Sequence, residues 1–221
     1  MTAKRRIGVL ISGRGSNLQA LIDAAKDPDY PAELVLVISN VPDVQGLARA
    51  EEAGIPTCTI NHKDFQSREA FEAALNDALD GASVELLCNA GFMRLLTESF
   101  VSRWLNRHLN IHPSLLPAFK GLDTHARVLD AGARISGCTV HFVRAAMDDG
   151  PIVAQAAVPV LPDDTEDTLA ARVLAAEHHL YPHAVQLVAS GQVTADGERV
   201  AGMPEGTGEP ALFSPPLTAN F

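Results

Sequence analysis

The sequence has no apolar run of transmembrane length. Its segment 1–6 carries a net positive charge from Lys4, Arg5 and Arg6 but does not lead into a secretory signal. The apolar run at 7–12 is too short for the hydrophobic part of a signal peptide, and no cleavage-site pattern follows it. We therefore expect a cytoplasmic protein with no membrane partner.

Cysteine is scarce, with only Cys58, Cys88 and Cys138, and no two of them form a CxxC pair. An odd number of widely spaced cysteines, each in an apolar strand-like segment, does not form a disulfide framework. We expect reduced thiols that fill the core, and a reactive thiol is the alternative.

Basic residues are in short supply: 17 Lys and Arg stand against 27 Asp and Glu, a formal net charge of −10 at pH 7. This balance argues against a broad nucleic-acid surface or an anionic membrane partner. It leaves room for small anionic substrates, which need only a local cluster of donors.

Metal-binding motifs are also lacking. His179 and His183 have the i, i+4 spacing of a metal pair on a helix, but the HExxH order is missing and Pro182 lies between them. A solvated helix face explains these histidines better, so we expect no metal.

What the sequence does contain is a regular alternation of strand-like and helix-like segments, which predicts a Rossmann-like, doubly wound α/β fold with a mostly parallel sheet. Two late strands with no helix between them predict an antiparallel portion toward the C-terminal half. The expected strands are 7–12, 33–39, 55–60, 84–89, 108–111, 138–143 and 152–160. The expected helices are 18–25, 44–53, 67–79, 97–107, 124–131 and 165–189, with the last interrupted or kinked near Pro182.

The length of 221 residues suits one catalytic domain over 1–200, followed by a Gly- and Pro-rich, loosely held tail over 201–221. Asp196-Gly197, between two short alternating runs, predicts a hairpin turn.

The glycine-rich segment GRGSN at 13–17 follows the first expected strand and precedes the first expected helix. Glycines let the backbone approach a ligand, and the free N–H groups of a helix start favour an anion. The dinucleotide fingerprint fails because Leu18 occupies the third glycine position, and no Walker motif is present. The segment thus favours a monophosphate, with a tight turn capped by Ser16 or Asn17 as the alternative.

The stretch NIHPSLLP at 110–117 places Asn110 and His112 at the end of an apolar strand. Side chains two residues apart on a strand point to the same face, and Pro113 and Pro117 end regular structure beyond them. An amide and a protonated imidazole suit stabilisation of a tetrahedral oxyanion in acyl transfer. Since no GxSxG nucleophile elbow is present, direct attack by a substrate is favoured over an acyl-enzyme. An ordinary loop with a capping Asn and a surface His is the alternative.

Two more segments carry candidate chemistry. Asp148 lies in a turn between the two late strands, and a carboxylate that reached His112 would orient the imidazole and complete an acid/base pair. The turn by itself favours a simpler explanation, a turn aspartate of the kind common near Gly and here doubled by Asp149. The loop GFMRLL at 91–96 could hold a flat heteroaromatic ring by stacking and main-chain hydrogen bonds, or could instead be a helix start packed on the core.

In their order and spacing, these motifs resemble those of the phosphoribosylglycinamide formyltransferases, a folate-dependent family of purine synthesis. The resemblance covers roughly residues 7–190. Its pieces are ISGRGSN at 11–17, SN at 39–40, SRE at 67–69, AGFMR at 90–94, LNIHPSLLP at 109–117 and DDGP at 148–151. Each piece is weak alone, and the ordered set is specific.

The resemblance implies an enzyme in which the amine of 5′-phosphoribosylglycinamide attacks the formyl carbon of the co-substrate 10-formyltetrahydrofolate. It implies that Asn110 and His112 stabilise the oxyanion, and that Asp148 favours the protonated imidazole and helps to move protons through water. The implied ribonucleotide contacts are Gly15, Ser16 and Asn17 at the phosphate and Glu177 at the ribose hydroxyls. The implied folate contacts are Arg68, Met93, Arg94, Leu95, Leu96, Asn110, Arg144, Ala145, Ala146, Met147 and Asp148.

Three positions depart from the family pattern. Asp123 stands where some relatives have a second histidine, so only His125 remains in that loop. Asp149 replaces a glycine of an Asp-Gly-Gly turn, and Leu174 replaces a polar residue of some relatives. These changes bear on affinity rather than on the reaction, and the oligomeric state stays open, a homodimer included.

Three rival functions share some of these features. Methionyl-tRNA formyltransferases add a C-terminal RNA-binding domain, for which the acidic and apolar C-terminal segment gives no support. Formyltetrahydrofolate hydrolases add an N-terminal regulatory domain and typically carry a His where this chain has Pro113. A non-catalytic phosphate- or nucleotide-binding module would explain the glycine loop, but not Asn110, His112 and Asp148 together.

Overall fold

The computed structural model describes residues 3–203 and residue 214. Its strands are β1 (Arg5–Ile11), β2 (Ala32–Ser39), β3 (Thr57–Thr59), β4 (Leu86–Asn89), β5 (His108–His112), β6 (Ile135–Phe142), β7 (Ile152–Pro159), β8 (Thr194–Asp196) and β9 (Arg199–Ala201). Its helices are α1 (Ser16–Ala25), α2 (Gln45–Glu52), α3 (Arg68–Gly81), α4 (Glu98–Arg103), α5 (Thr124–Asp130) and α6 (Glu166–Ala189), with a 3₁₀ turn, η1 (His62–Asp64).

Seven strands form one sheet in the order β3-β2-β1-β4-β5-β6-β7. The pairs among β1 to β5 are parallel, whereas β5–β6 and β6–β7 are antiparallel. The predicted doubly wound α/β fold, with its antiparallel portion in the C-terminal half, is therefore confirmed. The predicted hairpin at Asp196-Gly197 is also present, as β8 paired with β9.

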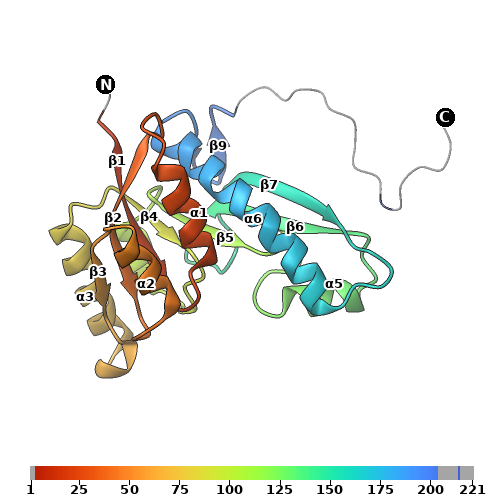
Figure 1. Cartoon of the computed structure of the whole chain (residues 1–221), viewed down its shortest axis with the longest axis horizontal. Helices are drawn as coiled ribbons and strands as arrows, with labels where there is room; N and C mark the ends of the chain where they lie inside the picture. Colours follow the sequence, from red (N-terminus) through yellow and green to blue (C-terminus); the bar gives the residue numbers. More distant parts are fainter. Residues whose placement is uncertain (1–2, 204–213, 215–221) are drawn as a thin grey trace.

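Helices cover both faces of the sheet because the central strands are apolar on both sides. On one face α1, α2 and α6 pack on alternate residues of β1, among them Ile7, Val9 and Ile11. On the other face α3 and α4 pack on residues that include Leu10. A third cluster joins α5 and the start of α6 to β6 and β7. Figure 1 shows α1 and α6 side by side across the sheet, with α5 near the far end of α6.

The first residues of two predicted helices, 67–79 and 97–107, are N-caps in the structure. The Ser67 hydroxyl accepts a hydrogen bond from the Ala70 N–H, and the Thr97 hydroxyl accepts one from the Phe100 N–H. The helix that begins after Thr97 is shorter than predicted, however, since α4 ends at Arg103. Asn106, at φ +60°, turns the chain in the left-handed region before β5.

An interruption at Pro182, one of the two predicted alternatives, was wrong, because the 24-residue helix α6 is continuous through Pro182; a kink there stays a prediction. Burial on both sides offsets the missing proline N–H: Tyr181, Ala184 and Val185 are fully buried against the sheet. The Tyr30 hydroxyl donates to the Pro182 carbonyl at 2.8 Å.

All three cysteines are free; Cys88 and Cys138 are buried, and Cys58 is half-buried. Burial raises the pKa of both buried thiols to about 12, in keeping with core filler. Among the described residues, no helix is both long and apolar enough to cross a bilayer. Most of the predicted tail at 201–221 lies outside the described residues.

Candidate active site

The candidate site lies at the carboxyl edge of the parallel strands, where the strand order changes direction. The chain winds outward from β1 through β2 to β3, then returns to place β4 on the other side of β1. Such a switch point opens a crevice between the loops that follow the two central strands. Here those loops are the glycine-rich segment after β1 and the 91–96 loop after β4, with the loop after β5 beside them.

Asn110 and His112 occupy alternate positions on β5, so their side chains share one face of the sheet as predicted. The antiparallel register pairs Asn110 with His141 and His112 with Thr139 on β6. His112 is buried, whereas Asn110 is half-buried. The two predicted oxyanion donors therefore lie on the same side of β5, at its carboxyl end.

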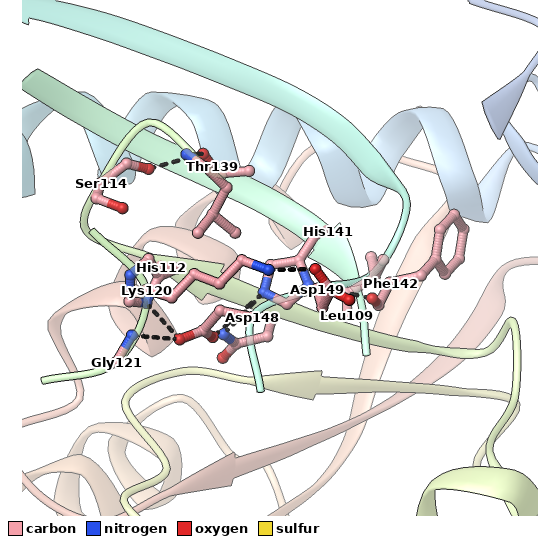
Figure 2. A network of polar contacts seen from close by, with 12 residues as sticks. Leu109, His112, Ser114, Lys120, Gly121, Thr139, His141, Phe142, Asp148 and Asp149 are labelled. Carbon is pink, nitrogen blue, oxygen red and sulfur yellow. Dashed lines mark hydrogen bonds and ion pairs between the residues drawn. The ribbon is translucent and has the colours of Figure 1, made fainter. Parts of the chain in front are cut away.

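Both ring nitrogens of His112 face acceptors. Nδ1 lies 3.4 Å from the Asp148 carboxylate (Figure 2). Nε2 lies 3.0 Å from the Phe119 carbonyl. A neutral imidazole offers one N–H and an imidazolium offers two, so this surrounding satisfies the protonated form in full. The distance between His112 and Asp148, which the sequence could not give, is short enough for an ion pair.

Asp148 is fixed from the opposite side. Its Oδ2 accepts a hydrogen bond from the Gly121 N–H at 2.9 Å, and its backbone has a left-handed φ of +51°. The neighbouring Asp149 forms an ion pair with Lys120, as Figure 2 shows. The extra negative charge of Asp149 is thus matched by a cation, and both contacts tie the loop after β5 to the turn after β6.

His141 is a site residue that the sequence reasoning missed. Burial lowers the pKa of its imidazole, and its Nδ1 lies 3.1 Å from the Phe142 carbonyl, which requires an N–H there. Nε2 is then the acceptor, and it faces the Asn110 amide nitrogen at 3.2 Å. One N–H of Asn110 is thereby held by His141, and the other is left for a ligand. The only signal in the sequence was a lone His within an apolar strand.

The glycine-rich segment forms the start of α1. Gly15, at φ +69°, is the N-cap, and no side chain caps this helix, so the alternative reading of Ser16 or Asn17 as a cap is wrong. A Cβ on Gly15 would lie 2.7 Å from the Gly46 Cα at the start of α2, which explains a glycine at both positions. The first N–H groups of α1 are therefore free of a side-chain cap at the crevice.

Helix α6 brings Glu177 to this segment across 160 residues of sequence. The Asn17 amide donates to the Glu177 carboxylate at 2.7 Å, and both side chains are buried. Burial raises the pKa of Glu177, and the hydrogen bond from Asn17 partly offsets that rise. Two residues predicted to hold the ribonucleotide are therefore in direct contact.

The predicted folate residues lie on four segments: the start of α3, the loop after β4, β5 and the loop after β6. Met93, Arg94 and Leu95 are exposed on the loop after β4, as are Ala145, Ala146 and Met147 on the loop after β6, whereas Leu96 is half-buried. Arg68 is exposed at the first residue of α3. Loops at one sheet edge with exposed apolar side chains suit an aromatic ligand.

The Arg144 side chain forms contacts within the protein. Its guanidinium donates to the Asn106 side chain and to the Gly197 carbonyl, and it lies 3.4 Å from the Glu198 carboxylate. The side chain thus anchors the β8–β9 hairpin, and only its backbone is left for a ligand. In residues 3–203 and 214, no three His, Cys, Asp or Glu side chains gather in a metal-binding arrangement.

The chain is similar to known formyl transferases over most of its length. A sequence model of the family described as formyl transferase matches residues 5–185. A trifunctional purine biosynthetic protein adenosine-3 of Bos taurus is 55% identical over 190 residues, which are 86% of this chain and 19% of that protein. The chain therefore spans about a fifth of the length of such relatives. Phosphoribosylglycinamide formyltransferase of Escherichia coli (strain K12) is 46% identical over 85% of this chain and 88% of that protein.

Solved structures agree with this likeness. Glycinamide ribonucleotide transformylase 1 from Symbiobacterium toebii is 47% identical, with a TM-score of 0.88 over 90% of this chain and 94% of that one. A formyltetrahydrofolate deformylase from Burkholderia mallei has a TM-score of 0.82 at 26% identity, over 91% of this chain and 71% of that one. The chain is thus similar in structure both to a transformylase and to a deformylase, and its sequence identity is higher to the transformylase.

Proposed function

The chain belongs to the formyl transferase family, and from this membership we propose that it transfers the formyl group of 10-formyltetrahydrofolate to the amine of 5′-phosphoribosylglycinamide in purine biosynthesis. One observation carries the proposal: Asn110, His112 and Asp148 converge at the carboxyl end of β5, at the same edge of the sheet at which β1 leads into a helix start suited to a phosphate. A binding module would need the helix start but not the other three side chains.

In the proposed reaction, the neutral amine attacks the formyl carbon and forms a C–N bond. The resulting oxyanion accepts a hydrogen bond from the free Asn110 N–H, and a second from His112 Nε2–H once that N–H leaves the Phe119 carbonyl. Collapse of the intermediate breaks the bond from the formyl carbon to N10 of the folate. The amine loses one proton, N10 gains one, and Asp148 beside His112 helps to relay the proton through water.

Ribonucleotide binding is assigned to the segment after β1 and to α6. Gly15, Ser16 and Asn17 would hold the phosphate by backbone N–H groups at the start of α1. Glu177 would accept hydrogen bonds from the ribose hydroxyls, since a carboxylate can accept more than the one that Asn17 donates.

Folate binding is assigned to the loops after β4 and β6, with Arg68 and Asn110 beside them. The exposed Met93 and Leu95 would pack on the ring system, and the backbone of Arg94, Leu96 and the 144–147 segment would hydrogen-bond its edges.

The test is incubation with both substrates and with each alone. Loss of the folate's formyl group, and its appearance on the ribonucleotide, should occur only when both are present. Release of formate without the ribonucleotide would instead identify a hydrolase, the activity named for the Burkholderia mallei neighbour. Binding of ligands without turnover would identify a binding module.

Several finer features remain predictions of the same proposal. These are the single domain over 1–200, the cytoplasmic location and the lack of a nucleic-acid partner, while the oligomeric state, a homodimer included, stays open. Light scattering after size-exclusion chromatography tests the dimer, and limited proteolysis tests the domain boundary.

A further inference from the structure

The loop that carries Met93, Arg94, Leu95 and Leu96 is held only at its two ends. Within residues 3–203 and 214, the backbone groups of Arg94, Leu95 and Leu96 form no hydrogen bond with the rest of the protein. Met93 at one end of the loop and Thr97 just after the other end are each held by a side chain from a distant segment. Free backbone groups between fixed ends are what a hydrogen-bonded ligand requires.

Ser12 forms the first anchor. Its hydroxyl oxygen accepts the Met93 N–H at 2.7 Å and donates its own proton to the Asn40 side-chain oxygen at 2.6 Å. Asn40 is only 2% exposed, and its amide nitrogen lies 3.1 Å from His62 Nδ1. Because the hydroxyl proton is committed to Asn40, a lone pair of Ser12 is directed at Met93.

Glu72 forms the second anchor. It projects from α3, is 3% exposed, and accepts the Thr97 N–H at 2.6 Å as well as the Thr97 hydroxyl proton. Thr97 is also the N-cap of α4, so Glu72 fixes the point where the loop becomes helix. A buried carboxylate with two donors on one residue is a strong local constraint.

We propose that Ser12 and Glu72 are positioning residues that hold the 93–96 loop in its folate-binding shape. This inference rests on the proposed function, in which the loop binds the folate. Neither side chain touches the reacting atoms. Their effect is to keep the backbone of Arg94 to Leu96 preorganised, so that folate binding does not have to order it.

The test is calorimetric titration of the unreactive product tetrahydrofolate into wild type and variants. Ser12→Ala removes the acceptor of the Met93 N–H, and loss of one such hydrogen bond should weaken tetrahydrofolate binding about fivefold. Ser12→Thr keeps the hydroxyl and should restore the affinity. Glu72→Gln removes the charge and replaces one of the two accepting carboxylate oxygens with an N–H donor, so it should also weaken folate binding.

Matched controls separate positioning from general destabilisation. Ser190→Ala removes a hydroxyl that donates to the Leu187 carbonyl on α6, and Glu85→Gln alters a carboxylate that accepts the Arg6 N–H on another part of the surface. Both should leave tetrahydrofolate affinity unchanged. The affinity for 5′-phosphoribosylglycinamide should change less than the folate affinity in the Ser12 and Glu72 variants.

Unchanged tetrahydrofolate affinity in Ser12→Ala and Glu72→Gln, with wild type active in formyl transfer, would overturn this inference and leave the proposed function standing. The inference is also overturned if Ser12→Ala weakens only the binding of the ribonucleotide, since Ser12 would then act through the phosphate segment. A wild-type protein that binds no tetrahydrofolate would overturn the proposed function itself.

Discussion

At the scale of single residues, the imidazole ring of His112 is oriented by hydrogen-bond acceptors from two different loops. Asp148 comes from the turn after β6 and the Phe119 carbonyl from the loop after β5, and both lie within 3.4 Å of the ring nitrogens. An imidazole held in this way is oriented before substrate arrives, which is the condition for efficient proton donation.

His112→Ala should lower kcat by about 10²–10⁴-fold, because it removes the general acid, with a modest effect on substrate binding. Steady-state kinetics with both substrates measure this. His179→Ala, on the exposed face of α6, is the matched control and should retain full activity. Near-normal kcat in His112→Ala would remove this residue from the mechanism.

Glu177 should make stability depend on pH. Burial raises its pKa in the folded state, so the folded protein binds more protons than the unfolded chain between the two pKa values. The unfolding free energy therefore falls as pH rises through this window, starting near the unfolded value of about 4.3. Glu177→Gln removes this fall and should be more stable than wild type at pH 8 but not at pH 4.

Urea denaturation between pH 4 and pH 8 measures that difference. Glu52→Gln, on the exposed surface of α2, is the control and should follow the wild-type pH dependence. A constant difference between Glu177→Gln and wild type across this range would show that Glu177 does not titrate with folding.

At the scale of elements, the phosphate segment depends on the close approach of α1 and α2. Gly46 donates its N–H to the Gly13 carbonyl at 3.1 Å, so the backbones of the two segments are joined directly. Arg49 of α2 adds hydrogen bonds to the Arg14 carbonyl and to the Gln19 side chain. The sequence showed the glycines at 13 and 15, which local pattern reveals. It gave no reason for Gly46, because its neighbour is 31 residues away.

Gly46→Ala should destabilise the fold by about 1–3 kcal/mol and raise the KM for the ribonucleotide. The added Cβ would lie 2.5 Å from the Ile11 Cδ1 and 3.0 Å from the Gly13 carbonyl, so it pushes α2 away from the segment. Gly81→Ala, at the end of α3 with no neighbour within 4 Å of its Cβ, should be neutral or slightly stabilising. Equal unfolding free energies for the two variants would contradict the packing argument.

At the scale of the whole molecule, the proposed ribonucleotide site joins the first helix to the last. Asn17 and Glu177 belong to α1 and α6, which unfold together only if the domain is cooperative. A ligand that binds across this junction stabilises the folded chain as a whole.

Saturating 5′-phosphoribosylglycinamide should therefore raise the Tm. At 100 times its Kd the ligand adds about 2.7 kcal/mol, equivalent to roughly 5–10 °C for a domain of this size. Thermal unfolding followed by circular dichroism measures this, and Asn17→Ala should show a smaller rise. A Tm that does not respond to the ribonucleotide at any concentration would argue against the site.

The sequence by itself determined the parts of this protein that depend on local pattern. Apolar periodicity gave the alternation of strands and helices, and Ser67 and Thr97 marked two helix starts. The ordered motifs gave the family, which the comparisons confirmed. These features were predictable because each depends on residues close together in the chain.

The tertiary structure alone decided which of these motifs meet. Only the fold places Asp148 beside His112, pairs Asn110 with the unexpected His141, and turns the Arg144 side chain away to the β8–β9 hairpin. Each of these contacts depends on strand register or on loop packing between segments 31 or more residues apart. No local periodicity encodes such register, since it is set by the burial of all the strands at once.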